Sequence, residues 1–558
     1  MEELLREKIA EVARAFGGDN VEVELSYPDE KYGDFASNIA LKLAASNDGD
    51  PRQIAADMTI SLKQMLGDRI DSIEVAGPGF INFVLSDKAL LEQMVAEPDQ
   101  PLKGQIIVAE YSDPNPFKIL HAGHLYTSIV GDVISNLLAA AGAEVYRVNY
   151  GGDVGLHVAK SIWAILKELD GEYPESLDNI PPMERGAWMS QMYVRGNSAF
   201  DEGVEEVVKE ITDINARVYD IQNGDDHDSP LAKIYWMTRN WSYVSFDQFY
   251  SRLNIFFDRY YPESETAPIG LKIVQEQLDK GVFERSDGAI VFRGEKYGLH
   301  TRVFVNSKGL PTYEAKELGL AQVKQRDFNY NRSLVITGNE QKHYMEVVYK
   351  ALEQFNPEIV KNTSHLTHGM VRLSGGKKMS SRLGNIITAE DVLIAAGEAA
   401  SEVNDNNDDR VVLAAVKYSF LKQAMGADIV YDPKESVNIL GNSGPYLQYA
   451  HARACSIMTK SGKEGYIGDI GRLTDGERKL VLKMSRLNAT IEQASRELAP
   501  HILCSYLYEL CQIFNQFYES NRVIGDDRER FRLHLVSMYA DKLKSGLKLL
   551  GITAPDKL

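Results

Sequence analysis

The chain contains 558 residues, including three cysteines, and its formal net charge is −19. It is too long for one hydrophobic core, so we expect about three domains. The charge argues against a protein that binds nucleic acid non-specifically, although a local basic patch would still allow contact with RNA.

Membrane and redox features restrict the class of protein further. No apolar stretch is long enough to cross a bilayer, and the acidic amphipathic N-terminus does not have the pattern of a signal peptide. Cys455, Cys504 and Cys511 are odd in number and lack the spacing of a zinc knuckle, which indicates reduced thiols in a core. We therefore expect a cytoplasmic protein with no membrane segment and no metal site of its own.

Residues 1–100 have the pattern of a small α+β domain. A helical stripe of apolar residues begins at Leu4 and ends before Gly17. Further along, two segments with strand-like sequences are joined through Gly77–Pro78–Gly79. The polar segment Glu97–Pro101 follows and is typical of a linker between domains.

Residues 105–131 contain the strongest candidate for a functional site. Ile106–Tyr111 is rich in β-branched residues and predicts a buried strand, and the two prolines that follow predict a loop. A helical pattern begins at His121, so the loop opens a helix whose first N–H groups suit a phosphate. His121 and His124 share one side of this helix, and Gly123 lets a ligand approach the backbone. Two metal ligands or two surface histidines would show the same spacing, but no third ligand is evident in the sequence.

A second strand is predicted at Ala143–Tyr150, after one helix. A strand–helix–strand unit of this length implies a right-handed parallel crossover. We therefore expect residues 101–400 to form an α/β domain with a Rossmann-like, doubly wound sheet that binds its ligand at the carboxyl ends of the strands. The acidic, largely helical residues from about 160 to 285 are predicted to be an insertion between the two halves of the sheet.

Candidate groups for a cationic substrate occur on both sides of this insertion. Tyr313 and Glu317 share a helix face, and an aromatic ring beside a carboxylate suits a guanidinium group. An ordinary amphipathic helix with its glutamate in water would show the same pattern. Glu110, at the end of a buried strand, requires a cationic partner, which is either the substrate or an internal arginine or lysine.

The C-terminal part combines a cationic loop with many helices. Gly375–Gly376 precedes Lys377 and Lys378, which predicts a mobile loop for phosphate or, alternatively, a solvated basic turn. Residues 401–558 are predicted to form an all-α helical bundle, and one long apolar stripe runs from Leu480 to Leu498.

Taken together, these motifs resemble the arginyl-tRNA synthetases, a family of class I aminoacyl-tRNA synthetases. The most specific segments are SDPNPFKILHAGH, KMSSR and GPYLQYAHAR, which begin at Ser112, Lys378 and Gly444. The resemblance implies that the protein activates arginine with ATP, accompanied by Mg²⁺, and transfers arginine to the terminal adenosine of its tRNA. It also implies that the N-terminal domain binds the outer corner of tRNA and that the C-terminal helical domain binds the anticodon. We expect a monomer.

The resemblance also implies roles for individual residues. Catalytic roles are implied for Lys118, His121, His124 and Lys378. Arginine binding is implied for Glu110, Ser112, Asn115, Tyr313, Glu317 and Gln341. ATP binding is implied for His121, Gly123, His124, Met370, Lys378 and Ser380. Contacts with tRNA are implied for Tyr446, Gln448, His451 and Arg453, whose side chains suit base stacking and phosphate contacts.

Three departures from the family pattern affect these roles. Ser381 replaces a lysine that normally neutralises pyrophosphate, and we expect Lys118, which lies on the phosphate-facing loop just before the first signature, to supply that charge. Glu317 replaces an aspartate, so the pocket must accommodate one more methylene. His157 replaces the glutamine of many members, which leaves this position without an assigned role.

Three other interpretations stay open from the sequence. They are a different class I synthetase, a small-molecule adenylyl- or cytidylyltransferase, and an RNA-binding protein without catalytic activity. Glu110, Tyr313 and Glu317 favour a cationic amino acid over the first. The second would not need the C-terminal helices, and the phosphate-facing lysines and histidines argue against the third.

Overall fold

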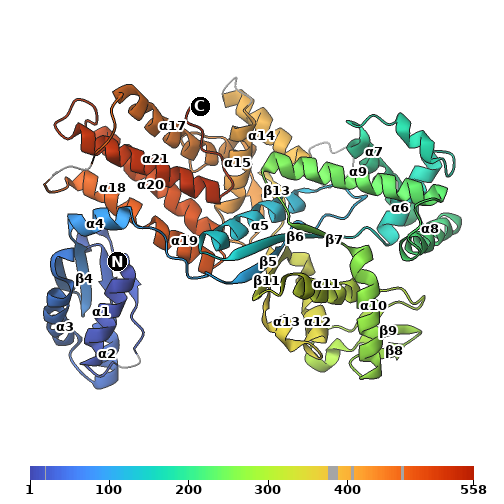
Figure 1. Ribbon diagram of the computed structural model, residues 1–558, viewed down its shortest axis with the longest axis horizontal. Helices are drawn as coiled ribbons and strands as arrows, with labels where there is room; N and C mark the ends of the chain where they lie inside the picture. The colour runs from blue at the N-terminus through green and yellow to red at the C-terminus, as the bar shows by residue number, and fades with distance from the viewer. Residues whose placement is uncertain (19–20, 375–386, 404–407, 467–470) are drawn as a thin grey trace.

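A five-stranded parallel sheet lies near the centre of the computed structural model (Figure 1). The structure describes residues 1–18, 21–374, 387–403, 408–466 and 471–558. The strands are ordered β12–β11–β5–β6–β7, and every neighbouring pair is parallel. They are β5 (Ile106–Glu110), β6 (Glu144–Gly151), β7 (Arg259–Pro262), β11 (Arg332–Gly338) and β12 (Thr363–His368).

This sheet is wound outward from β5 in two directions. The chain adds β6 and β7 on one side of β5, and later adds β11 and β12 on the other side. The predicted Rossmann-like, doubly wound fold is therefore confirmed. In such folds the ligand binds where the winding direction changes, which here is the carboxyl end of β5 beside β11.

Alternate side chains of β5 face opposite layers. Ile107 and Ala109 pack into the core that contains α5 (Ala122–Ala140) and the C-terminal helices, whereas Val108 packs toward α11 (Tyr313–Phe328). This alternation follows from the two-residue period of a strand. The sheet is thus covered by α5 on one face and by α11 on the other.

Two glycines set the position of α11. Helix α10 (Glu263–Asp279) crosses α11 at Gly270 and Gly319, where an added Cβ would overlap the backbone of the other helix. The two helices therefore approach more closely than larger residues would permit. This contact fixes the height of Tyr313 and Glu317 above the sheet.

The N-terminal domain is α+β, as predicted. Its antiparallel sheet has the order β1–β2–β4–β3 and packs against helices of the same domain. The elements are α1 (Glu2–Arg14), β1 (Leu25–Ser26), β2 (Phe35–Ser37), α2 (Ile39–Asn47), α3 (Pro51–Leu66), β3 (Ile70–Ala76), β4 (Phe80–Leu85) and α4 (Asp87–Met94).

Charged contacts dock this domain onto the C-terminal helices, although the two are far apart in sequence (Figure 1). Arg478 on α18 (Asp475–Ser485) donates to Asp34 at 2.6 Å and to Asp87 at 3.1 Å. Asp87 also accepts a hydrogen bond from Leu473 N at 2.8 Å. The first and last domains are therefore in direct contact.

The helical insertion is shorter than predicted. It contains α6 (Leu156–Glu168), α7 (Arg185–Asp201), α8 (Glu205–Asn223) and α9 (Pro230–Leu253), which share their own core. The predicted end near residue 285 is wrong because β7 belongs to the main sheet and α10 packs on α11. We did not predict the strand β7 because it has only four residues and ends in proline.

Small elements connect the second half of the sheet to its surroundings. An antiparallel sheet of β8 (Glu284–Ser286), β9 (Ala289–Phe292) and β10 (Arg302–Val305) precedes α11. After β11 come α12 (Lys342–Glu353) and α13 (Pro357–Lys361), and after β12 the strand β13 (Val371–Leu373) pairs in parallel with β14 (Ile429–Tyr431).

The C-terminal region is a helical bundle, as predicted. The stripe from Leu480 to Leu498 is divided between two helices at Arg486, whose guanidinium lies over the Tyr27 ring of the N-terminal domain. No helix among the described residues is long and apolar enough to cross a lipid bilayer. The remaining helices are α14 (Ala389–Val403), α15 (Asp409–Leu421), α16 (Pro433–Ser436), α17 (Gly444–Ser461), α19 (Leu487–Arg496), α20 (Pro500–Ser520) and α21 (Glu529–Leu549).

Candidate active site

The loop after β5 has a backbone conformation that few side chains favour. Ser112, Asp113 and Phe117 have φ angles of 75°, 48° and 66°. Each residue in this left-handed region costs on the order of 1–3 kcal/mol and persists where the surroundings fix it. The loop must therefore be held in place by specific contacts.

Polar side chains supply those contacts. Asp113 Oδ1 accepts a hydrogen bond from Tyr150 N at 2.8 Å, and Asn115 Oδ1 accepts one from Gly152 N at 2.7 Å. The two donors lie at the carboxyl end of β6, so the loop is tied to the neighbouring strand. Within the described part of the chain, Asn115 Nδ2 has no hydrogen-bond partner, which leaves this amide for a ligand.

The hydroxyl of Ser112 has an internal role. It is hydrogen-bonded to Ser128 Oγ and to Tyr250 OH, both at 2.7 Å, and the residue is 4 % exposed. The side chain therefore holds the loop against α5 and α9. A contact between Ser112 and arginine stays a prediction.

The two histidines cap the helix that follows. His121 Nδ1 accepts a hydrogen bond from Gly123 N at 3.1 Å, and His124 Nδ1 accepts one from His121 N at 3.2 Å. Each neutral imidazole therefore carries its proton on Nε2, which is left as a donor. Burial lowers the pKa of both imidazoles, most strongly that of His124, so both are neutral near pH 7. The first turn of α5 thus offers two ring N–H donors beside its unpaired backbone N–H groups, which suits phosphate oxygens.

Lys118 lies at the same end of α5. Its side chain is half-buried, and burial lowers the pKa of its amine while Glu263 acts in the opposite direction. Glu263 itself is buried and is paired with Lys316 at 2.6 Å. Among the residues that the structure describes, Lys118 forms no ion pair, so its charge is available to a ligand.

The second cationic motif falls outside the described residues. Lys378 and Ser380 lie within residues 375–386, and the described part of the chain resumes at Ile387. Ala122 N donates to Ile387 O at 2.9 Å, so the chain resumes against the first turn of α5.

Met370, the other residue assigned to ATP on this side, lies beyond the carboxyl end of β12. It is 56 % exposed, and its N–H group donates to Asp428 Oδ1 at 2.9 Å. The side chain is therefore free to contact a ligand at the edge of the sheet where His121 lies.

Three carboxyl groups and one lysine interact where β5 passes under α11. Lys324 forms a short, buried ion pair with Glu110. Burial, followed by repulsion from Glu110, raises the pKa of Glu317 and of Asp113 well above their usual values. The partner of Glu110 is thus an internal lysine, but one cation faces three acids. The raised pKa values favour the protonated forms of Glu317 and Asp113, and a guanidinium group bound here would favour their carboxylates.

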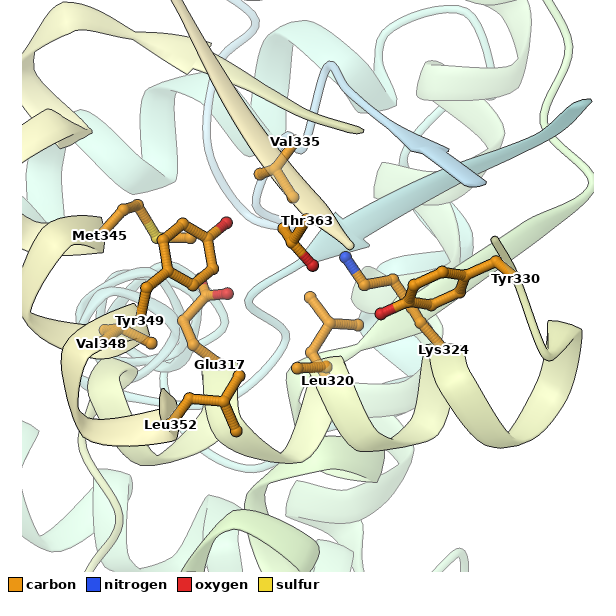
Figure 2. A pocket seen from close by; sticks show the side chains of 11 residues that line it. Glu317, Leu320, Lys324, Tyr330, Val335, Met345, Val348, Tyr349, Leu352 and Thr363 are labelled. Carbon is orange, nitrogen blue, oxygen red and sulfur yellow. The ribbon is translucent and has the colours of Figure 1, made fainter. Parts of the chain in front are cut away.

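Figure 2 shows Glu317 and Lys324 on one face of α11, with Tyr349 of α12 beside the glutamate. The space between them is a cavity of about 10 Å³, which holds about one water molecule. An arginine side chain does not fit inside it. The predicted contact of Glu317 with a guanidinium therefore requires an approach from the side of Tyr313, which is 48 % exposed.

His157 connects Tyr313 to the loop after β6. His157 Nε2 lies 2.7 Å from Gly152 O, and Nδ1 lies 3.4 Å from Tyr313 OH. Burial, with the nearby charge of Lys118, lowers the pKa of this imidazole to about 3, so the ring is neutral. Nε2–H then donates to the carbonyl and Nδ1 accepts from the tyrosine hydroxyl. The departure at position 157 thus has a structural role that the sequence did not reveal.

Sequence reasoning also missed Lys324, Asp113 and the buried Glu263–Lys316 pair. Lys324 was detectable, because it follows Glu317 by seven residues and so lies on the same helix face. Asp113 lies in an irregular loop and gave no periodic signal. Gln341, at the start of α12, is exposed and stays a prediction.

The four residues predicted to contact tRNA divide into two pairs. Gln448 and His451 are buried, at 0 % and 2 % exposed, and they hold the C-terminal segment through Thr553 O and Pro555 O. The predicted RNA contact of these two side chains is wrong, because neither reaches the surface.

Tyr446 and Arg453 are half-buried and lie on the same helix, α17. Asn515 on α20 hydrogen-bonds to the Tyr446 hydroxyl, and the Arg453 guanidinium lies over the Tyr518 ring. Both keep accessible surface, so an RNA contact at these positions stays a prediction.

Replacing Glu110 by glutamine is expected to lower the free energy of unfolding by about 3 kcal/mol, because the buried Lys324 would lose its direct partner. The double variant Glu110→Gln, Lys324→Met removes both charges and is expected to recover most of that loss. Thermal unfolding of the three proteins measures the effect. Glu284→Gln, which breaks an exposed pair with Arg293, is the control and should change little. Equal melting temperatures for the wild type and Glu110→Gln would contradict the ion pair.

Known families match the chain in three consecutive segments. The family described as "Arginyl tRNA synthetase N terminal domain" matches residues 1–85, and "tRNA synthetases class I (R), catalytic domain" matches residues 85–433. The family described as "DALR anticodon binding domain" matches residues 447–558.

Curated relatives and solved structures agree with these matches. The arginine–tRNA ligase of Porphyromonas gingivalis is 30 % identical over 536 residues, which cover 88 % of each chain. That of Phocaeicola vulgatus is 28 % identical and covers 91 % of each chain. The Thermus thermophilus arginyl-tRNA synthetase structure is similar to this fold with a TM-score of 0.82, at 24 % identity and with 100 % of both chains covered.

Proposed function

This chain belongs to the arginyl-tRNA synthetases, class I enzymes that join arginine to tRNA, and we propose that the groups around the first turn of α5 and the start of α11 carry out this reaction. The enzyme is an arginine–tRNA ligase that uses ATP. The roles of its individual residues below are proposals.

Activation of arginine requires a site for the triphosphate. The carboxylate of arginine attacks the α-phosphorus of ATP, and pyrophosphate leaves. His121 and His124 donate their Nε2–H groups to phosphate oxygens, and Gly123 leaves room for the phosphates at the helix N-terminus. Lys118 neutralises the departing pyrophosphate. These groups act by position and charge rather than by covalent chemistry.

Residues beyond β12 complete the ATP site. Met370, exposed at this edge of the sheet, contacts the adenosine part of ATP. Lys378 and Ser380 provide further phosphate contacts; they lie outside the described residues, and the support for them is the sequence resemblance and the bond of Ile387 to the first turn of α5.

Arginine is held by charge and by shape. Glu317 receives the guanidinium, while Glu110, whose direct partner is Lys324, adds negative charge beneath it. The Tyr313 ring stacks on the guanidinium, and Asn115 Nδ2 donates to the amino acid. Ser112 and Gln341 complete the site. Three acids opposite Lys324 alone are the observation that carries this assignment.

Transfer to tRNA follows at the same place. The 2′- or 3′-hydroxyl of the terminal adenosine attacks the arginyl carbonyl and releases AMP. Tyr446 and Arg453 contact the anticodon region, and the N-terminal domain contacts the outer corner of the tRNA. We further infer a monomeric, cytoplasmic enzyme.

Mg²⁺ enters with ATP in this proposal. The groups at the first turn of α5 are ring and ammonium N–H donors, whereas Mg²⁺ prefers oxygen ligands. They suit the phosphate oxygens and not the ion, which the triphosphate and water would hold. Mg²⁺ would supply charge neutralisation on the phosphates.

ATP–pyrophosphate exchange with each standard amino acid, with and without tRNA, tests the proposal. Arginine should stimulate exchange and the others should not. Stimulation by lysine in place of arginine would contradict the assignment of the pocket, because an ammonium group does not need paired carboxylates beside an aromatic ring.

Arginine binding is expected to release protons and to weaken as pH falls. The pKa of Glu317 is raised in the free enzyme, and a bound guanidinium lowers it, so binding favours the deprotonated form. Affinity should therefore be full above the raised pKa and decline as pH falls through it. Calorimetry in buffers with different ionisation enthalpies measures the released protons. Glu317→Gln should release fewer protons, and proton uptake by the wild type would contradict the assignment.

A further inference from the structure

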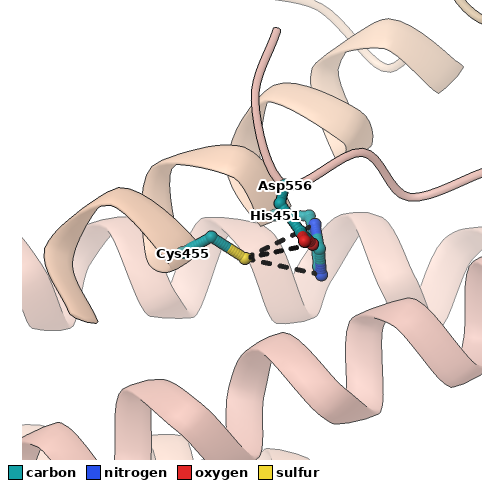
Figure 3. A group of neighbouring side chains, drawn as sticks. All are labelled: His451, Cys455 and Asp556. Carbon is teal, nitrogen blue, oxygen red and sulfur yellow. Dashed lines mark hydrogen bonds between the residues drawn. The ribbon is translucent and has the colours of Figure 1, made fainter. Parts of the chain in front are cut away.

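Three side chains with metal-binding chemistry meet where α17 passes the C-terminal segment (Figure 3). His451 and Cys455 lie one helical turn apart on α17, and Asp556 follows α21. Cys455 Sγ is 3.8 Å from His451 Nε2 and 3.8 Å from Asp556 Oδ1. All three donor atoms lie within 4.8 Å of one another. Asp556 is 101 residues from Cys455 in the sequence, so the cluster could not be predicted from local spacing.

A backbone carbonyl fixes the tautomer of the histidine. His451 is 2 % exposed, and its Nδ1 lies 2.9 Å from Pro555 O. Nδ1–H therefore donates to this carbonyl, which leaves Nε2 unprotonated and able to ligate a metal, although Cys455 Sγ lies almost equally far from Nδ1, at 3.9 Å. Within the described chain, the Cys455 sulfur at 3.8 Å is the contact recorded for Nε2. A backbone carbonyl that fixes the tautomer of a ligating imidazole is a common feature of protein metal sites.

We propose that His451, Cys455 and Asp556 bind one Zn²⁺ ion, with water as the fourth ligand. Zn–S and Zn–N bonds of about 2.3 and 2.0 Å at a tetrahedral angle place the two donor atoms about 3.5 Å apart. The observed 3.8 Å requires a contraction of a few tenths of an ångström and a rotation of the imidazole or of the thiol, because Sγ lies at nearly the same distance from Nδ1. The thiol gives its proton to solvent when the metal binds.

The donor set selects the class of metal. One thiolate, one imidazole and one carboxylate suit zinc and similar borderline ions, whereas Mg²⁺ and Ca²⁺ prefer oxygen ligands. The site is thus separate in chemistry and position from the Mg²⁺ that accompanies ATP.

Bound zinc would fasten the C-terminal segment to α17. That segment is already held by Gln448, which donates to Thr553 O at 2.7 Å, and by the bond from His451 to Pro555 O. The metal adds Asp556 to this attachment. Because α17 also carries Tyr446 and Arg453, zinc would stiffen the helix on which the proposed anticodon contacts lie.

The test uses the full-length enzyme after treatment with a chelator. Titration with Co²⁺ should give about one equivalent of tetrahedral cobalt, with a thiolate-to-cobalt charge-transfer band that Zn²⁺ abolishes. Cys455→Ser should remove this band, and Asp556→Asn should weaken Co²⁺ binding by roughly 10–100-fold or more. Zn²⁺ should raise the melting temperature of the wild type more than that of either variant. His227→Ala, which removes a surface histidine beside Asp225, is the matched control and should bind as the wild type does.

Two results would overturn the proposal. The first is that the metal-free wild-type enzyme, shown to be folded by circular dichroism, binds Co²⁺ without giving a charge-transfer band. The other is a Cys455→Ser variant whose Co²⁺ spectrum equals that of the wild type. Cys504 and Cys511 are both fully buried, so neither accounts for a thiolate–metal band in the native protein.

Discussion

Replacing Lys118 by alanine is expected to slow arginine activation by about 10²–10³-fold while the KM for arginine changes little. Removal of one preorganised group that stabilises a developing anion has an effect of this size. Lys118 is half-buried beside the first turn of α5 and, within the described residues, forms no ion pair. We therefore expect its charge to act on the departing pyrophosphate and not on the amino acid. ATP–pyrophosphate exchange in the presence of tRNA, with each substrate varied in turn, measures both quantities.

Lys160→Ala is the matched control for this variant. Lys160 contributes to the field at Lys118, but its own Nζ is held by Asn197 at 2.9 Å and lies 3.5 Å from Asp201. It should therefore exchange pyrophosphate at close to the wild-type rate. Exchange near the wild-type rate for Lys118→Ala would show that another group neutralises the leaving group.

Replacing Glu317 by glutamine is expected to raise the KM for arginine by roughly 10–150-fold. This corresponds to about 1.5–3 kcal/mol for a hydrogen bond to a charged group. The glutamine keeps the size of the side chain but removes the charge that attracts the guanidinium. The KM for ATP should stay near its wild-type value, because ATP is assigned to the first turn of α5.

Two further variants separate charge from shape at this position. Glu317→Asp keeps the charge and shortens the chain by one methylene, so its KM for arginine should lie closer to the wild-type value than that of Glu317→Gln. Glu346→Gln removes an acid that is partly exposed on α12 and should leave both KM values unchanged. If Glu317→Gln had a normal KM for arginine, the guanidinium would have to be placed elsewhere.

Local patterns predicted the elements that hold the candidate site. The strand at Ile106 and the helix that begins at His121 were predictable because β-branched residues, prolines and helical spacing lie within one short stretch. The pair Tyr313 and Glu317 was predictable for the same reason. Each of these signals depends on neighbours in sequence.

Contacts between distant segments were not predictable in this way. Glu110 and Lys324 are 214 residues apart. The sequence around Glu110 is compatible with a substrate cation and with an internal cation as its partner. Gln448 and His451 have polar side chains that suit RNA, yet their hydrogen bonds to residues near the C-terminus bury them. Burial of a polar group depends on a distant backbone partner, which cannot be identified from the local sequence.

The docking of the N-terminal domain has a consequence for synthesis of the chain. Asp87 binds Leu473 and Arg478, which are 386 and 391 residues further along. At about 5–20 residues per second, a ribosome needs roughly 20–80 s to translate the distance between these partners. The N-terminal domain is therefore synthesised well before Leu473 and Arg478, and it cannot make these contacts until then. A chain released prematurely would carry this domain with Asp34 and Asp87 deprived of Arg478, their cationic partner on α18.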